Sequence, residues 1–209
     1  MEKYIRAVTP AGGSQHAASL CAELSPSEQP FYVDVRPITG EPVNECFHVV
    51  NRHLEKFGGL AVIGWAIWEL PTVFVEAEFH AIWKSPDGVY IDVAPKSTPT
   101  QRVLFLPDYS RTYDGYPLDN IRRPISSAPE VRNFFRALGA KYELMNRGGR
   151  AREHGEVCLR GSEALEYHRI EGAIAQFGEQ VHALYPSVGP YMPCPCGSGK
   201  KSKWCHRPA

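Results

Sequence analysis

The chain has 209 residues, of which 43% are hydrophobic and 22% are charged, with 23 basic residues (Lys and Arg) against 23 acidic ones. A chain of this size and apolar content can bury a core of its own. Its zero net charge argues against an overall affinity for nucleic acid or for an anionic membrane surface.

No segment has the pattern of an export signal or a membrane span. Residues 1–20 lack a long apolar core, and the longest apolar run, residues 60–68, is short and interrupted by glycine. Three cysteines stand singly at Cys21, Cys46 and Cys158, which is typical of reduced thiols rather than of a disulfide framework. We therefore expect a cytoplasmic protein.

The first third of the chain predicts one strand and one helix. Residues 1–30 carry little signal, and we assign them no structure. Residues 31–35 alternate apolar and polar side chains, as a half-buried strand does. A helix follows, because apolar residues recur at helical spacing between Asn44, a suitable N-cap, and the stop signal at Gly58.

Three further strands are expected at residues 60–70, 74–83 and 89–93, which are rich in β-branched and aromatic side chains. Pro71 and the turn sequence at residues 85–88 separate them, and the last two read as a hairpin.

The second half of the chain is mainly helical. A weak strand signal at residues 102–106 precedes a loop that extends to about residue 129. Apolar stripes then predict two helices, around residues 131–145 and 170–184, and residues 186–193 read as a linker.

The strand region contains the residue order of Cys-His-Asp acyl-transfer chemistry. Cys46 falls near the start of its helix, where the helix dipole favours a thiolate. If residues 81–83 pair with residues 89–91, Asp92 lies roughly opposite His80 and can orient its imidazole. The sequence therefore indicates Cys46 as nucleophile, His80 as base and Asp92 as orienting carboxylate.

Plainer interpretations of the same residues stay open. Cys46 stands beside Phe47 on an apolar helix, so it can equally be a core residue. Glu76, Glu78 and His80 share one strand face, which we interpret as a solvated polar face rather than as a metal site.

The stretch from His80-Ala81-Ile82-Trp83 to Gly88-Val89-Tyr90-Ile91-Asp92-Val93-Ala94-Pro95 resembles transglutaminase-like proteins of the papain-like superfamily. The similarity covers roughly residues 44–95. It implies a thiol-dependent active site with Cys46, His80 and Asp92 in the roles given above.

The C-terminus contains a metal-ligand pattern. Cys194-Pro195-Cys196 and Cys205-His206 are separated by eight residues, and Gly197 and Gly199 permit a tight turn between the two pairs. Three thiolates and one imidazole complete a tetrahedral structural zinc site without an open position for water. We therefore expect Cys194, Cys196, Cys205 and His206 to bind zinc for structure rather than for catalysis.

This tail, from about Tyr191 to Pro208, resembles the SEC-C motif first recognised at the C-terminus of the preprotein translocase ATPase SecA. The similarity implies one zinc ion and a basic surface that docks an acidic protein partner. Lys200, Lys201, Lys203 and Arg207 supply local positive charge, although a merely solvated face is the alternative.

The expected fold class is α+β, a small antiparallel sheet with packed helices and a C-terminal zinc knuckle. Its parts are an N-terminal segment (1–30), a sheet domain (31–129), a helical segment packed on it (130–185), and a linker with the knuckle (186–209). The leading functional interpretation is a zinc-binding protein whose knuckle docks a protein partner. The alternative is a thiol-dependent peptidase, amidase or transglutaminase-like enzyme.

Overall fold

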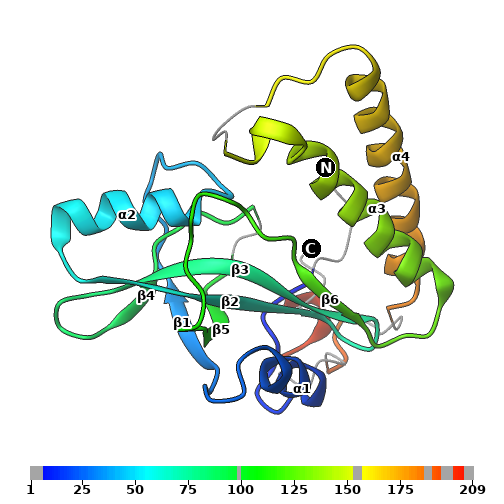
Figure 1. The fold of residues 1–209 in the computed structure, drawn as a ribbon. Coiled ribbons are helices and arrows are strands. Elements are labelled where there is room, and N and C mark those ends of the chain that lie inside the picture. Colours follow the sequence, from blue (N-terminus) through cyan, green and yellow to red (C-terminus); the bar gives the residue numbers. More distant parts are fainter. Residues whose placement is uncertain (1–6, 98–99, 153–156, 186–189, 194–199, 205–209) are drawn as a thin grey trace.

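The computed structural model describes residues 7–97, 100–152, 157–185, 190–193 and 200–204, and its architecture is α+β (Figure 1). The strands are β1 (Phe31–Val35), β2 (Leu60–Leu70), β3 (Phe74–Lys84), β4 (Tyr90–Asp92), β5 (Arg102–Pro107) and β6 (Ile121–Pro124). The helices are α1 (Gln15–Leu24), α2 (Cys46–Phe57), α3 (Pro129–Met145) and α4 (Ser162–Ala183), with short 3₁₀ turns at Gly148–Arg152 and Ser202–Trp204.

Five of the strands close into a barrel. Their order is β2-β5-β1-β4-β3, β3 pairs back with β2, and β6 extends the sheet from β3. The expectation of an antiparallel sheet is wrong at one place, because β1 and β4 pair in parallel. The chain between these two strands passes through α2, β2 and β3, which is long enough for the crossover that a parallel pair needs.

One face of the barrel strands forms a single apolar cluster drawn from four strands, made of Val33, Val62, Ala66, Ile82, Val103 and Phe105. Gly64 lies on β2 between two of these positions and stands opposite His80 in the ladder. A Cβ at Gly64 would lie 2.1 Å from the carbonyl oxygen of Leu106, so this position is packed too tightly for a side chain.

Helix α1 packs on the other face of β2 and β3, where Leu20 and Cys21 join the cluster of Trp65 and Phe79. The helix begins at Ser14, whose hydroxyl accepts a hydrogen bond from the backbone N–H of Ala17 at 3.2 Å. This helix was not predicted, although a serine cap followed by apolar residues at helical spacing is a helix signal.

Helix α2 lies along β3, with Val49 and Val50 packed against Ala81 and Val93. It ends at Gly58 as predicted, but the predicted cap is wrong. Asn44 has a positive φ of 64°, so it stands outside the helix, and Glu45 occupies the N-cap without a side-chain hydrogen bond to the helix. Cys46 is consequently the first residue of α2.

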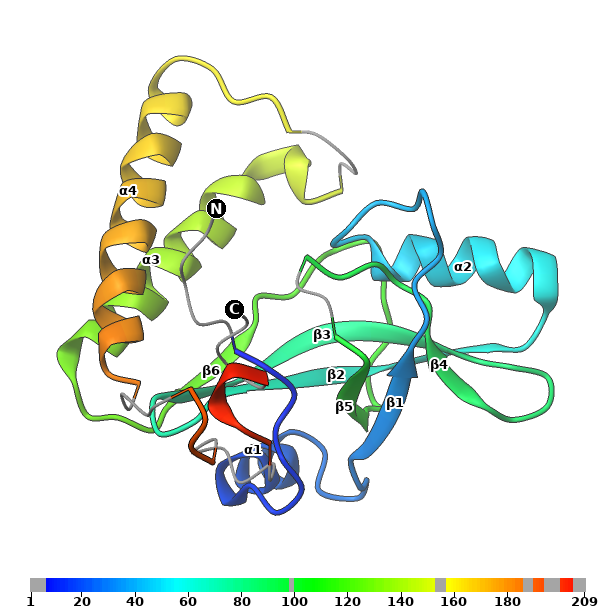
Figure 2. The same ribbon diagram turned by 180° about the vertical axis from the view of Figure 1, so that it is seen from behind.

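Helices α3 and α4 lie side by side at one end of the sheet, as both views show (Figures 1 and 2). Val131 of α3 and Val181 of α4 pack against Leu70, Val73 and Phe74, at the connection between β2 and β3. Both helices were predicted, whereas β6, which the sequence analysis placed in a loop, was missed. No helix within the described ranges has the length and apolar character needed to cross a bilayer.

Candidate active site

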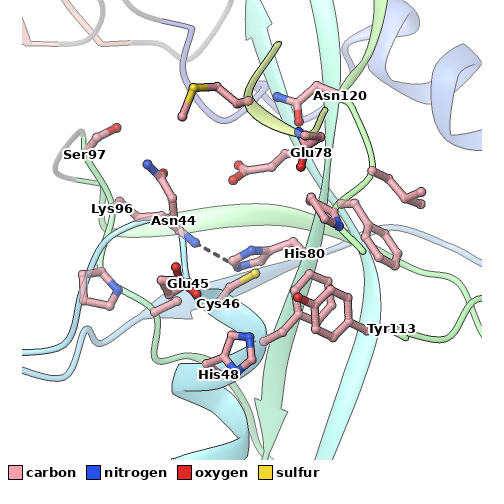
Figure 3. A pocket seen from close by; sticks show the side chains of 18 of the residues that line it. Asn44, Glu45, Cys46, His48, Glu78, His80, Lys96, Ser97, Tyr113 and Asn120 are labelled. Carbon is pink, nitrogen blue, oxygen red and sulfur yellow. Dashed lines mark hydrogen bonds between the residues drawn. The ribbon is translucent and has the colours of Figure 1, made fainter. Parts of the chain in front are cut away.

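A cavity of about 550 Å³ opens where the N-terminus of α2 meets β3 and the segment after β4 (Figure 3). Asn44, Glu45 and Cys46 line it from the α2 side, and Glu78 and His80 line it from β3. Further walls come from Lys96 and Ser97 after β4, from the loop between β5 and β6, and from the end of α3. Two of the three predicted catalytic residues therefore face one cavity.

His80 and Asp92 form a buried hydrogen-bonded pair. His80 Nε2 lies 2.9 Å from Asp92 Oδ2, and the two residues are 1% and 0% exposed. Asp92 Oδ1 accepts a second hydrogen bond, from the backbone N–H of Ala94 at 3.1 Å, which fixes the carboxylate plane. A carboxylate held in this way can select the tautomer and orientation of the imidazole.

The contact forms although the expected strand register is wrong by two residues. Trp83 pairs with Ile91, so Asp92 stands beside Ile82 in the ladder and not beside His80. Diagonal neighbours on one face of an antiparallel pair remain within reach of long side chains. The imidazole and the carboxylate meet along this diagonal.

Lys96 is part of the same cluster, and the sequence analysis did not single it out. Its Nζ lies 2.7 Å from Asp92 Oδ2. It also lies 2.9 Å from His80 Nε2, a contact that Figure 3 marks with a dashed line. The only sequence signal is its position four residues after Asp92, in a stretch without a recognisable element. Asp92 is therefore shared between an ammonium group and an imidazole.

Burial and charge act in opposite directions on this cluster. Burial and the Lys96 ammonium both lower the pKa of His80, but Asp92 and Cys46 outweigh them and raise it to about 10. Burial raises the pKa of Asp92, but His80 and Lys96 outweigh it and lower the value to about 2. Asp92 is therefore held as a carboxylate, and its negative charge favours the protonated form of His80.

Cys46 completes the predicted set from the N-terminus of α2. It is 8% exposed and lines the cavity, and Figure 3 shows its sulfur directed toward the ring of His80. No hydrogen bond joins the two side chains, and His80 Nδ1 is buried without a hydrogen-bond partner among the described residues. With Nε2 held by Asp92, Nδ1 is the ring nitrogen left to exchange a proton, and such contacts often tighten only when substrate binds.

The other described cysteines have different surroundings. Cys21 is 2% exposed within the α1 cluster, where burial raises the pKa of its thiol to about 11. Cys158 is exposed. Cys46 itself also contacts the apolar cluster of Val49 and Ala81, so packing and a chemical role are compatible at this position.

The face that carries Glu76, Glu78 and His80 is not the solvated face expected from the sequence. Arg122 of β6 donates a hydrogen bond to Glu76 at 2.7 Å, and the Trp68 indole donates one to Glu78 at 2.8 Å. Each polar side chain of this face thus has a protein partner. Within the described residues, no group of three or more His, Cys, Asp or Glu side chains is arranged to hold a metal ion.

The predicted zinc ligands Cys194, Cys196, Cys205 and His206 lie outside the described residues. The described residues beside them do contact each other. Pro193 and Lys201 form an antiparallel bridge, and the backbone N–H of Lys203 donates to the carbonyl of Pro190 at 3.0 Å. Three thiolates and one imidazole are suitable ligands for zinc. Their arrangement around a metal ion stays a prediction.

Comparisons of the chain with protein-family models, with curated proteins and with solved structures found no match. The functional inference consequently comes from the cavity and its side chains.

Proposed function

We propose that the protein is a thiol-dependent enzyme that cleaves or transfers an acyl group, with Cys46 as nucleophile, His80 as proton carrier and Asp92 as its orienting group. One observation carries this proposal. His80 is hydrogen-bonded through Nε2 to the buried Asp92, its buried Nδ1 has no hydrogen-bond partner among the described residues, and the Cys46 sulfur is directed toward its ring at the cavity wall (Figure 3). This is the arrangement that an activated thiol requires.

The chemistry would proceed in two steps. The Cys46 thiolate attacks the substrate carbonyl, and the His80 imidazolium gives its Nδ1 proton to the leaving group, which departs and leaves a thioester on Cys46. Water or an amine then attacks the thioester, and His80 Nδ1 takes up the proton of that nucleophile. The products are a carboxylic acid or a new amide, and the thiolate is restored.

The N-terminus of α2 would stabilise the negative oxygen formed in each step. The first backbone N–H groups of a helix have no partner within the helix, and the N-cap residue Glu45 makes no side-chain hydrogen bond to them. Since Cys46 is the first residue of this helix, these donors lie beside its thiol.

Alkylation kinetics test this proposal. Iodoacetamide near neutral pH should label Cys46 faster than Cys158 or Cys21, as measured by peptide mass spectrometry, because the Cys46 sulfur is directed toward the ring of His80 (Figure 3), whose protonated form would stabilise a thiolate. His80→Ala should slow the labelling of Cys46 and leave that of Cys158 unchanged. Equal, slow labelling of Cys46 and Cys158 in the unmodified protein would rule out an activated thiol.

We propose a second function, partner docking, for the tail. Lys203 Nζ lies 4.2 Å from the ring centroid of Tyr191 and 4.3 Å from that of Trp204, and these rings are 64% and 63% exposed. An exposed surface of aromatic rings and lysines suits an acidic protein partner. Zinc bound by Cys194, Cys196, Cys205 and His206 would hold this surface in shape.

A pull-down with and without a zinc chelator tests the docking proposal, since removal of the metal should change the set of bound proteins. An unchanged set would count against it. Both a reactive thiol and zinc thiolates suit a reducing compartment, so we propose the cytoplasm as the location.

A further inference from the structure

We propose that Glu78 selects the substrate by binding a cationic group close to the carbonyl that Cys46 attacks. This inference rests on the proposed thiol chemistry and adds a substrate class to it: amides or esters that carry a primary ammonium or guanidinium group a few bonds from the reacting carbonyl.

The first support is the position of Glu78. It lies two residues before His80 on β3, so both side chains are on the same face of the strand, about 7 Å apart along it. Both line the same cavity, and Figure 3 shows them directed to the same side, across from Asn44. A group bound to Glu78 is therefore a few bonds away from an acyl carbon placed beside His80.

The second support is the partner of Glu78. Its Oε2 accepts a hydrogen bond from Trp68 Nε1 at 2.8 Å. This indole is a neutral donor, so it orients the carboxylate without balancing its charge. No cationic side chain within the described residues forms a salt bridge with Glu78, and this half-buried side chain lines the cavity.

Three other charged groups of the cavity wall are paired with protein side chains, and Glu45, a further carboxylate of the wall, stands at the N-cap of α2. The basic residues on the wall, Lys96 and Arg150, bind Asp92 at 2.7 Å and Glu163 at 2.9 Å, and the acidic Glu76 binds Arg122 at 2.7 Å. Glu78 is thus a carboxylate of the β3 wall without an ion pair among the described residues, and a cationic ligand would balance its charge. A half-buried carboxylate gains most from a charge-assisted hydrogen bond to an ammonium or guanidinium group.

Charged thiol reagents of similar size test the inference. The trimethylammonioethyl and sulfonatoethyl methanethiosulfonates carry opposite charges and both form a mixed disulfide with a thiol. The ratio of cationic to anionic modification rate is measured at Cys46 by mass spectrometry, with the exposed Cys158 as internal reference. Glu78→Gln should lower this ratio at Cys46 about fivefold or more, because it removes a full charge from the wall of the cavity that Cys46 also lines.

Two variants serve as controls. Glu55→Gln removes the same charge from the exposed face of α2 and should leave the ratio unchanged. Glu78→Asp keeps the charge and should retain most of the preference of Cys46 for the cationic reagent. Trp68→Phe, which removes the orienting N–H together with part of the ring, should give an intermediate ratio. It provides a second test if Glu78→Gln exposes the buried Cys21 and so proves to be misfolded.

The outcomes separate the two proposals. Suppose that Cys46 stays reactive and that its ratio of cationic to anionic modification rate is the same in Glu78→Gln and in the unmodified protein. This result would overturn the role of Glu78 but not the thiol chemistry. Failure of Cys46 to react even with the neutral methyl methanethiosulfonate, while Cys158 reacts, would overturn the thiol chemistry and the role of Glu78 with it.

Discussion

His80 Nε2 and Asp92 Oδ2 lie 2.9 Å apart although the two residues are offset by two positions in the β3–β4 ladder. Ile82, rather than His80, stands directly beside Asp92 in the ladder. Ile82 belongs to the apolar cluster of the barrel. The imidazole–carboxylate pair is consequently packed against the barrel core, and His80 alone of the two lines the cavity. This is a rigid support for a proton carrier.

Loss of the Asp92 charge should destabilise the fold. Asp92→Asn leaves the Lys96 ammonium and the His80 imidazolium buried without a counter-charge, so we expect the free energy of unfolding to fall by about 3 kcal/mol in urea titrations. Adding Lys96→Met removes one of the two cations and should recover part of that loss.

An exposed aspartate provides the matched control for this prediction. Asp34 forms a surface ion pair with Arg36, and its side chain is 67% exposed. Asp34→Asn should therefore change the free energy of unfolding by less than about 0.5 kcal/mol. Similar effects of the two substitutions, or no recovery on adding Lys96→Met, would contradict a buried charge cluster.

Stability should depend on pH through His80. Folding raises the pKa of His80 from 6.5 to about 10, so its contribution is complete below about pH 6.5 and disappears as the pH rises toward 10. Urea unfolding at pH 6, 8 and 10 should therefore show the stability difference between the unmodified protein and His80→Gln decreasing with pH. A difference that stays constant over this range would contradict an imidazolium in the folded state.

His53 should show the opposite behaviour and serves as the control. Burial and the nearby Lys56 lower the pKa of His53, so the unfolded chain binds its proton more readily. The stability difference between the unmodified protein and His53→Gln should consequently increase as the pH rises toward 6.5 and stay level above it.

Gly64 should tolerate no side chain. A Cβ there would lie 2.1 Å from the Leu106 carbonyl oxygen and 2.9 Å from the Phe105 ring, so Gly64→Ala should cost about 2 kcal/mol or more in the free energy of unfolding. Gly172 of α4 has open space around its Cβ position, and Gly172→Ala should instead stabilise the protein by about 0.5 to 1 kcal/mol. Equal effects in thermal or urea unfolding would contradict the packing described for β2.

Metal analysis checks the proposed knuckle. We expect one zinc ion per chain, and Cys205→Ser should weaken its retention during dialysis against a chelator, because a three-ligand site binds less tightly. Cys158→Ser, a change at a cysteine outside the motif, should leave the zinc content unchanged. Zinc content that does not depend on Cys205 would contradict the predicted ligand set.

The long elements of the fold could be predicted because their side chains carry strong signals. β2 and β3 are runs of β-branched and aromatic residues bounded by turn sequences, and their predicted limits differ from the observed ones by at most one residue. β6 was missed because it is short and carries two arginines. Its place in the sheet depends on the contact of Arg122 with Glu76, which no local pattern shows.

The candidate site was predictable in its residues and less so in its geometry. The order of Cys46, His80 and Asp92 indicated the chemistry, but the register depended on how the β3–β4 turn closes, and the parallel pairing of β1 with β4 depended on the closure of the barrel. For Lys96 the sequence offered only its position four residues after Asp92, and for Glu78 only its place on one strand face with Glu76 and His80. Their surroundings come from tertiary packing, which places one beside Asp92 and the other on the cavity wall.

Formation of an acyl-enzyme on Cys46 tests the central claim most directly. Mixing the protein with p-nitrophenyl acetate should release a burst of about one p-nitrophenol per chain, with the acetyl group mapped to Cys46 by mass spectrometry and removed by hydroxylamine. Cys46→Ser should abolish the burst and His80→Ala should slow it at least tenfold. A burst that survives Cys46→Ser, or acetylation of Cys46 no faster than that of Cys158, would contradict the account.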